Sequence, residues 1–108
     1  MSTVADVLPY MQHWLDARAA QVTALADFAT AKTNMATARN AVAARVGAGD
    51  TAAVMSAVVT TYLGARVIYL QKDPLQRAAV ALTAARFQTF EQMMELLATG
   101  QTVPPFTG

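Results

Sequence analysis

The chain has 108 residues, a formal net charge of +1 and a charged fraction of 14%. This length corresponds to one domain, and the near-neutral charge gives no electrostatic reason to expect binding to nucleic acid or to an anionic membrane surface. The absence of cysteine excludes disulfide bonds and thiolate metal sites. We therefore expect a single helical domain over residues 1–108 that binds no nucleic acid.

Residues that begin or end helices divide the chain up to residue 72 into two predicted helices. The first spans residues 9–46, with Pro9 at its start or at a kink. Gly47 and Gly49 end it, because glycine adopts the left-handed conformation that follows a helix. Asp50 is then placed to cap a second helix over residues 51–72.

A third predicted helix spans residues 74–99, with Asp73 as its cap and Pro74 at its first position. Because proline disfavours helix in the residue before it, turn chemistry favours a chain reversal here and an antiparallel bundle of about three helices. If the chain only kinks at Pro74, the fold is a long helical hairpin. Both arrangements are all-α.

The predicted fold is elongated. A helix over residues 9–46 would span about 57 Å, whereas a compact globule of this length is roughly 34 Å across. Gly100 stands where a helix-ending glycine belongs, and Pro104 and Pro105 prevent continuation. Residues 101–108 are therefore expected to form an extended, proline-containing tail.

The first predicted helix carries a seven-residue pattern that is typical of helix pairing. Large residues fill one column and alanine fills the column three residues later, which lets two helix axes approach closely. A further apolar column indicates more than one neighbour, so we expect other copies of the chain to complete the bundle. The predicted interface residues are Trp14, Ala17, Ala24, Phe28, Ala31, Met35, Ala38, Val42, Phe90, Met94, Leu97 and Phe106.

Charged residues beside this pattern are candidates for ion pairs across the interface. A mostly cationic column follows the alanine column, and two glutamates four residues apart share one face of the last helix. An arginine within the apolar second helix needs a partner if it is buried. The candidates are Arg18, Lys32, Arg39, Arg66, Glu91 and Glu95.

No pattern in the sequence indicates catalysis, a cofactor or a metal. His13 lies near Met11, as in a haem site ligated by histidine and methionine, but a single histidine near a helix start is more often a boundary residue. The Glu-x-x-His pairs of di-iron bundles and the common nucleophile, phosphate-loop and zinc motifs are missing. We therefore expect no catalytic residue, no cofactor and no metal site.

The segment most like a membrane span is residues 52–70, but Thr60, Thr61 and Arg66 interrupt it. An arginine at the centre of a bilayer costs roughly 2.5–3.5 kcal/mol. The first residues also lack the basic and apolar regions of a signal peptide. We therefore expect a bundle helix rather than a membrane span, and a location in the cytoplasm or in a soluble assembly.

These features favour a non-enzymatic structural or protein-interaction protein that self-associates through its alanine-rich helices. A charged fraction of 14% is low for a soluble monomer, which suggests that part of the surface is covered by other copies. Such a protein could belong to a virion, a secretion system or a scaffold. The alternative is a small helical adaptor or chaperone that binds a partner helix in a methionine-rich apolar groove.

The alanine column gives a first testable prediction. Ala31→Leu should disrupt assembly, because overpacking a close helix contact costs roughly 1–3 kcal/mol, whereas the neighbouring Thr30→Ala should leave assembly intact. Gel filtration coupled to light scattering measures both variants. Equal and negligible effects would show that the column is misplaced.

Overall fold

A computed structural model describes residues 2–49 and 51–108. Within these residues the secondary structure consists of two helices, α1 (Val4–Ala48) and α2 (Ala52–Ala98), without strands. The all-α prediction is confirmed, and the prediction of about three helices is wrong. Two long helices joined by one short turn correspond to the helical hairpin, which was the alternative prediction.

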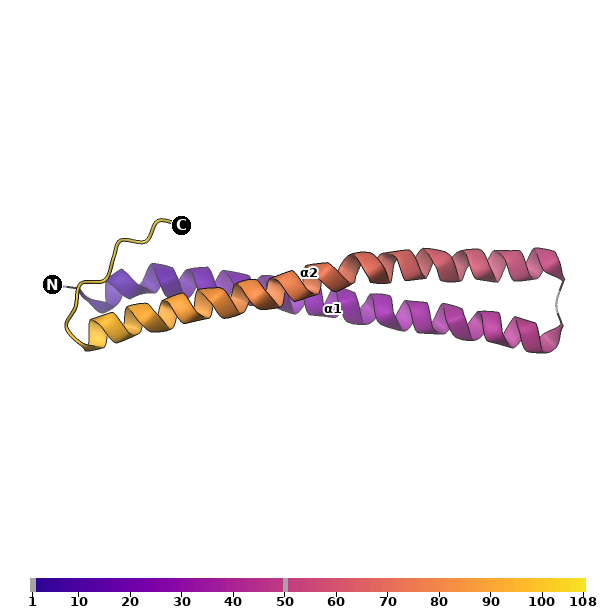
Figure 1. The fold of residues 1–108 in the computed structure, drawn as a ribbon, viewed down its shortest axis with the longest axis horizontal. Coiled ribbons are helices and arrows are strands. Elements are labelled where there is room, and N and C mark those ends of the chain that lie inside the picture. The colour runs from indigo at the N-terminus through magenta and orange to yellow at the C-terminus, as the bar shows by residue number, and fades with distance from the viewer. Residues whose placement is uncertain (1, 50) are drawn as a thin grey trace. The chain divides into compact units, whose positions relative to one another are not determined.

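The chain divides into two compact units. The terminal unit contains Met1–Thr23 and Arg77–Gly108, and the turn unit contains Ala24–Gln76. In each unit a segment of α1 lies beside a segment of α2 that runs in the opposite direction (Figure 1). The two units are therefore described separately below.

The helix α1 begins at Val4, five residues before the predicted start at Pro9. Capping of the first turn by Asp6, which is one half of a capping box, explains this difference. The Asp6 carboxylate accepts the Thr3 N–H at 2.8 Å, and the Asp6 N–H donates to the Thr3 carbonyl at 3.0 Å. Asp6 also places a negative charge in the first turn, where the helix dipole favours it. These contacts start the helix although Pro9 inside it cannot donate a helix hydrogen bond.

A glycine in the left-handed conformation follows α1, as predicted, but the helix ends at Ala48, two residues later than predicted. Gly47 lies within α1, and Gly49 adopts the left-handed conformation with φ of 66°. The second helix is capped by Thr51, whose carbonyl accepts the Met55 N–H at 3.0 Å. The predicted cap, Asp50, lies outside the described residues.

Pro74 neither reverses the chain nor starts a helix, because α2 runs without interruption from Ala52 to Ala98. The predicted boundary between residues 72 and 74 is therefore wrong. The partly buried residues keep the spacing of three and four on both sides of the proline, so one face of α2 is apposed to α1 throughout each unit. Packing along this face outweighs one missing helix hydrogen bond. The residues of this face are Met55, Val58, Tyr62, Ala65, Tyr69, Lys72, Gln76, Ala79, Thr83, Arg86, Phe90, Met93 and Leu97.

The end of α2 agrees with the prediction for Gly100. This residue has a φ of 75°, and its N–H donates to the Leu97 carbonyl at 3.2 Å. The Gln101 N–H donates to the Leu96 carbonyl at 2.9 Å. Together these bonds form a Schellman motif, which satisfies the last carbonyl groups and turns residues 101–108 back onto the terminal unit.

The continuity of α2 predicts the effect of replacing its proline. Pro74→Ala should raise the free energy of unfolding by about 1–3 kcal/mol, because alanine restores an N–H donor and removes a steric clash inside the helix. Thermal unfolding measures the change, with Pro105→Ala in the tail as a control that should have little effect. A neutral or destabilising Pro74→Ala would instead indicate a helix start at this position.

Candidate interaction surfaces

The predicted alanine column is the most buried part of α1. Ala17, Ala31 and Ala38 are only 3%, 4% and 8% exposed, and they are buried within a single chain. Each lies on the side of α1 that is apposed to α2 in its own unit. The column therefore serves pairing within the chain, while its predicted role between chains stays a prediction.

The large residues of the neighbouring column contact aromatic side chains of α2. In the terminal unit, the Trp14 ring lies 4.9 Å from the Phe87 ring and 5.8 Å from the Phe90 ring, measured between centroids. In the turn unit, the Phe28 and Tyr69 rings are 5.3 Å apart. The other predicted interface residues of this column and of the alanine column, Ala24, Met35 and Val42, are partly buried along the same side of α1.

The six candidates for interface ion pairs are all exposed. None of them forms an ion pair with another described residue. Arg18 has a defined position, because its guanidinium lies over the Trp14 ring at 5.8 Å from the centroid, a cation–π contact. The pairing of these six residues with charged residues of another chain stays a prediction.

The tail docks on the terminal unit through an apolar contact and two hydrogen bonds. Val103 is buried and packs with Val7 and Tyr10. The Tyr10 hydroxyl donates to the Pro104 carbonyl at 2.7 Å, and the Val103 N–H donates to the Ser2 hydroxyl at 2.8 Å. These contacts fix the tail across the start of α1.

Phe106, a predicted interface residue, continues this docking within the chain. Its ring meets the rings of Tyr10 and His13 edge-on, with centroids 5.1 Å apart in each case. The tail residues 106–108 border a cavity of about 340 Å³ that also contains Arg86. The Arg86 guanidinium donates to the His13 carbonyl at 3.0 Å. His13 and Met11 line different cavities, so the structure does not bring together the two side chains of the haem hypothesis.

Sequence reasoning missed the small apolar core of the terminal unit. Val7, Tyr10 and Val103 form it, with Phe90, Met93, Leu96 and Leu97 packed against it. Val7 lies seven residues before Trp14, and Tyr10 lies seven residues before Ala17. Extending the seven-residue pattern toward the N-terminus would have identified both, whereas the sequence does not indicate that Val103 packs against them.

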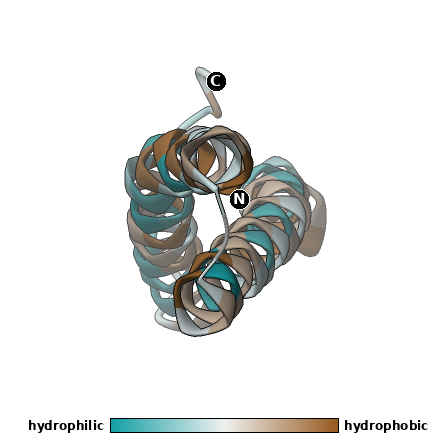
Figure 2. Ribbon diagram, turned by 90° about the vertical axis from the view of Figure 1, so that its right-hand side faces the viewer, coloured by the Kyte–Doolittle hydropathy of each residue, from teal (hydrophilic) through white to brown (hydrophobic). Residues whose placement is uncertain are grey.

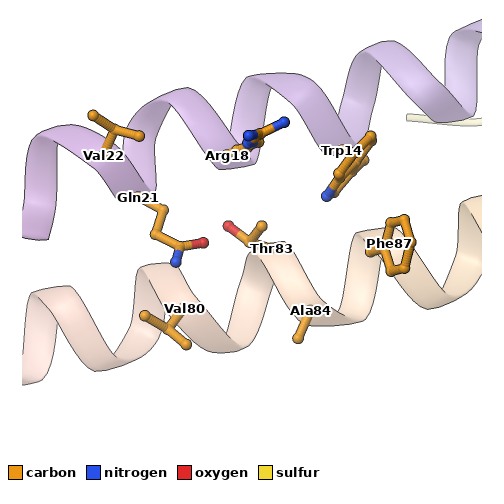
Figure 3. Close-up of a pocket in the computed structure, with 8 residues that line it drawn as sticks. All are labelled: Trp14, Arg18, Gln21, Val22, Val80, Thr83, Ala84 and Phe87. Carbon is orange, nitrogen blue, oxygen red and sulfur yellow. The ribbon is translucent and has the colours of Figure 1, made fainter.

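One side of the terminal unit forms an open apolar groove. A cavity of about 410 Å³ lies between Trp14 and Val22 of α1 and Val80 and Phe87 of α2 (Figure 3). A second cavity, of about 220 Å³, continues along the same two helices. It is lined by the predicted interface residues Phe90, Met94 and Leu97 together with Val4, Val7, Leu8 and Met11. We call this side the open groove.

A second apolar surface lies on α2 within the turn unit and faces away from the α1 pairing face. Its residues fall outside the three-and-four spacing of the buried positions, and their exposed fractions range from 48% to 58%. Apolar residues, brown in Figure 2, accordingly occur around the circumference of the helices. We call this surface the outer patch; it consists of Leu63, Val67, Ile68, Leu70 and Leu75.

The outer patch contributes to the apolar character of α2 as a whole. Among the described residues, α2 is the one helix long and apolar enough to cross a membrane by length and composition, and none of its most apolar window is buried. Length and composition alone are weak support for a membrane span, since other kinds of helix share them.

Within the described residues, no group of three or more histidine or acidic side chains could hold a metal ion.

Comparison with known proteins returned no match to a family model, to a curated protein or to a solved structure.

The tail contacts predict a specific effect of removing one hydroxyl group. Tyr10→Phe should lower the stability of tail docking by about 0.5–1.5 kcal/mol, because the Pro104 carbonyl loses its donor. Hydrogen exchange at the Val103 N–H should become correspondingly faster. Tyr62→Phe is the matched control, since the Tyr62 hydroxyl bonds to no other described residue. Unchanged exchange in the Tyr10 variant would contradict the observed docking.

Proposed function

We propose that this chain is a non-enzymatic structural or protein-interaction protein that self-associates and forms part of a larger assembly. The observation that supports this most strongly is the outer patch. Its five large apolar side chains lie outside the face of α2 that packs against α1, and they are about half exposed. Covering such a surface is favourable by roughly 25 cal/mol per Å² of apolar area, which other chains could provide.

The small core of the chain supports the same proposal. Six hydrophobic residues of the described chain are buried, and three of them are alanines, which bury little apolar area. The accessible surface is 7229 Å², about a quarter more than the roughly 5,800 Å² expected for a compact monomer of this mass. Association would cover part of this additional surface.

The outer patch provides the test of the proposal. Gel filtration with light scattering should show an oligomer whose mass falls on dilution. The double variant Leu63→Gln/Leu70→Gln should shift this equilibrium toward smaller species, with the apparent Kd of association through the outer patch raised at least about tenfold. Ala19→Gln/Ala26→Gln, at exposed positions of α1, is the control and should leave the mass unchanged. A chain that is monomeric at all concentrations would contradict self-association.

A second candidate function is that of a small adaptor or chaperone for a partner helix. It is favoured by the fully apolar cavity that Met11 and Met94 line in the open groove, since flexible methionine side chains adapt to varied helices. In this case the chain would be a monomer that binds an apolar dye, and an added amphipathic helix would raise its melting temperature.

A further inference from the structure

The two sides of the terminal unit differ in how they are covered. On one side, the tail places Phe106 against Tyr10 and His13 and closes the edge where α1 meets α2. On the other side lies the open groove, which no segment of the described chain covers. Its lining is mostly apolar and also includes Arg18, Gln21 and Thr83. A protein partner can therefore approach the paired helices of this unit from the open groove without displacing the tail.

The charges beside the open groove complement one another. Arg18 lines it and lies over the Trp14 ring. Glu91 lies seven residues after Ala84, another lining residue, and so occupies the same column of α2. Neither side chain forms an ion pair with a described residue. The groove is thus flanked by a cation and an anion that lack an ion-pair partner within the described chain.

Helix geometry brings these two charges to the same level. Long side chains on a helix project toward its N-terminus, so Arg18 extends toward Trp14 and Glu91 extends toward Phe87. The Trp14 and Phe87 rings are only 4.9 Å apart, at one level of the antiparallel pair. A two-fold axis parallel to the helices keeps every residue at its level and places α1 of one copy over α2 of the other. Arg18 of each copy then faces Glu91 of the other copy.

We propose that the open groove of the terminal unit seats the same groove of a second copy, so that four helical segments form an antiparallel bundle around the Trp14–Phe87 contacts. This inference rests on the proposed self-association and adds a contact between two copies in the terminal unit to the outer patch of the turn unit. The aromatic pair forms the centre of the interface, and the two Arg18–Glu91 pairs lie at its rim.

The surface area of the chain agrees with an interface of this kind. A standard protein interface buries about 800 Å² from each partner. The accessible surface of 7229 Å² exceeds that of a compact monomer of this mass by about 1,400 Å². One interface of standard size therefore fits within this additional surface and leaves the outer patch for further contacts in an assembly.

The absence of cysteine makes a cross-linking test direct. Val22 and Val80 line the groove from α1 and α2 at one level. A mixture of Val22→Cys chains and Val80→Cys chains should form a mixed disulfide dimer, because α1 of one copy lies over α2 of the other. Ala20→Cys replaces Val22→Cys in the control mixture. Residue 20 is exposed and lies seven residues after His13, on the tail side of α1, so it should cross-link several-fold less.

Charge reversal tests the identity of the occupant. Arg18→Glu and Glu91→Arg should each raise the dissociation constant at least about tenfold, because each places like charges together. The double variant Arg18→Glu/Glu91→Arg should return the dissociation constant to within a few-fold of the original value. Such rescue is not expected if a foreign helix occupies the groove or if the copies meet through a different face.

The outcomes separate this inference from the proposed function. Cross-linking at Val22 with rescue by the charge swap supports the groove interface. A concentration-dependent oligomer with equal cross-linking at Ala20 and Val22, or without rescue, overturns the groove interface and leaves self-association intact. A monomer at all concentrations overturns both, and a monomer stabilised by a foreign amphipathic helix assigns the groove to another protein.

Discussion

The close approach of α1 and α2 depends on the small side chains of Ala17, Ala31 and Ala38. In each unit these residues lie where α1 is most buried, and the larger residues of the neighbouring column contact aromatic rings of α2. Two helices can bury only one stripe of each against the other. The apolar residues outside that stripe therefore stay exposed, and they make association with further chains the expected next level of structure.

The tail gives the terminal unit two unlike sides. Val103 and Phe106 provide apolar cover at one edge, and the Schellman motif at Gly100 directs the chain there. Because the tail is held by Tyr10 and Ser2 of the same chain, this edge needs no partner. The opposite groove and the outer patch of the turn unit are apolar surfaces that stay exposed in the described chain.

The sequence predicted the helical class, the alanine column and the glycine at the end of α2, because these follow from periodicity and local backbone preference. It failed at Pro9 and Pro74, where local preference indicates a helix boundary but capping at Thr3 and continuous packing along α2 outweigh the missing donors. It also did not identify the residues that Val103 contacts, since the docking of a tail depends on contacts about a hundred residues apart in sequence. The open groove could not be predicted, because it depends on which edge the tail covers.

The central claim is that one copy of this chain has more apolar helix surface than it can cover alone. Equilibrium unfolding in urea, followed by circular dichroism over about a hundredfold range of protein concentration, tests it most directly. If association stabilises the folded chain, the midpoint of unfolding rises with concentration. A midpoint that stays constant over the whole range, with a sedimentation coefficient of a stable monomer, would contradict the claim.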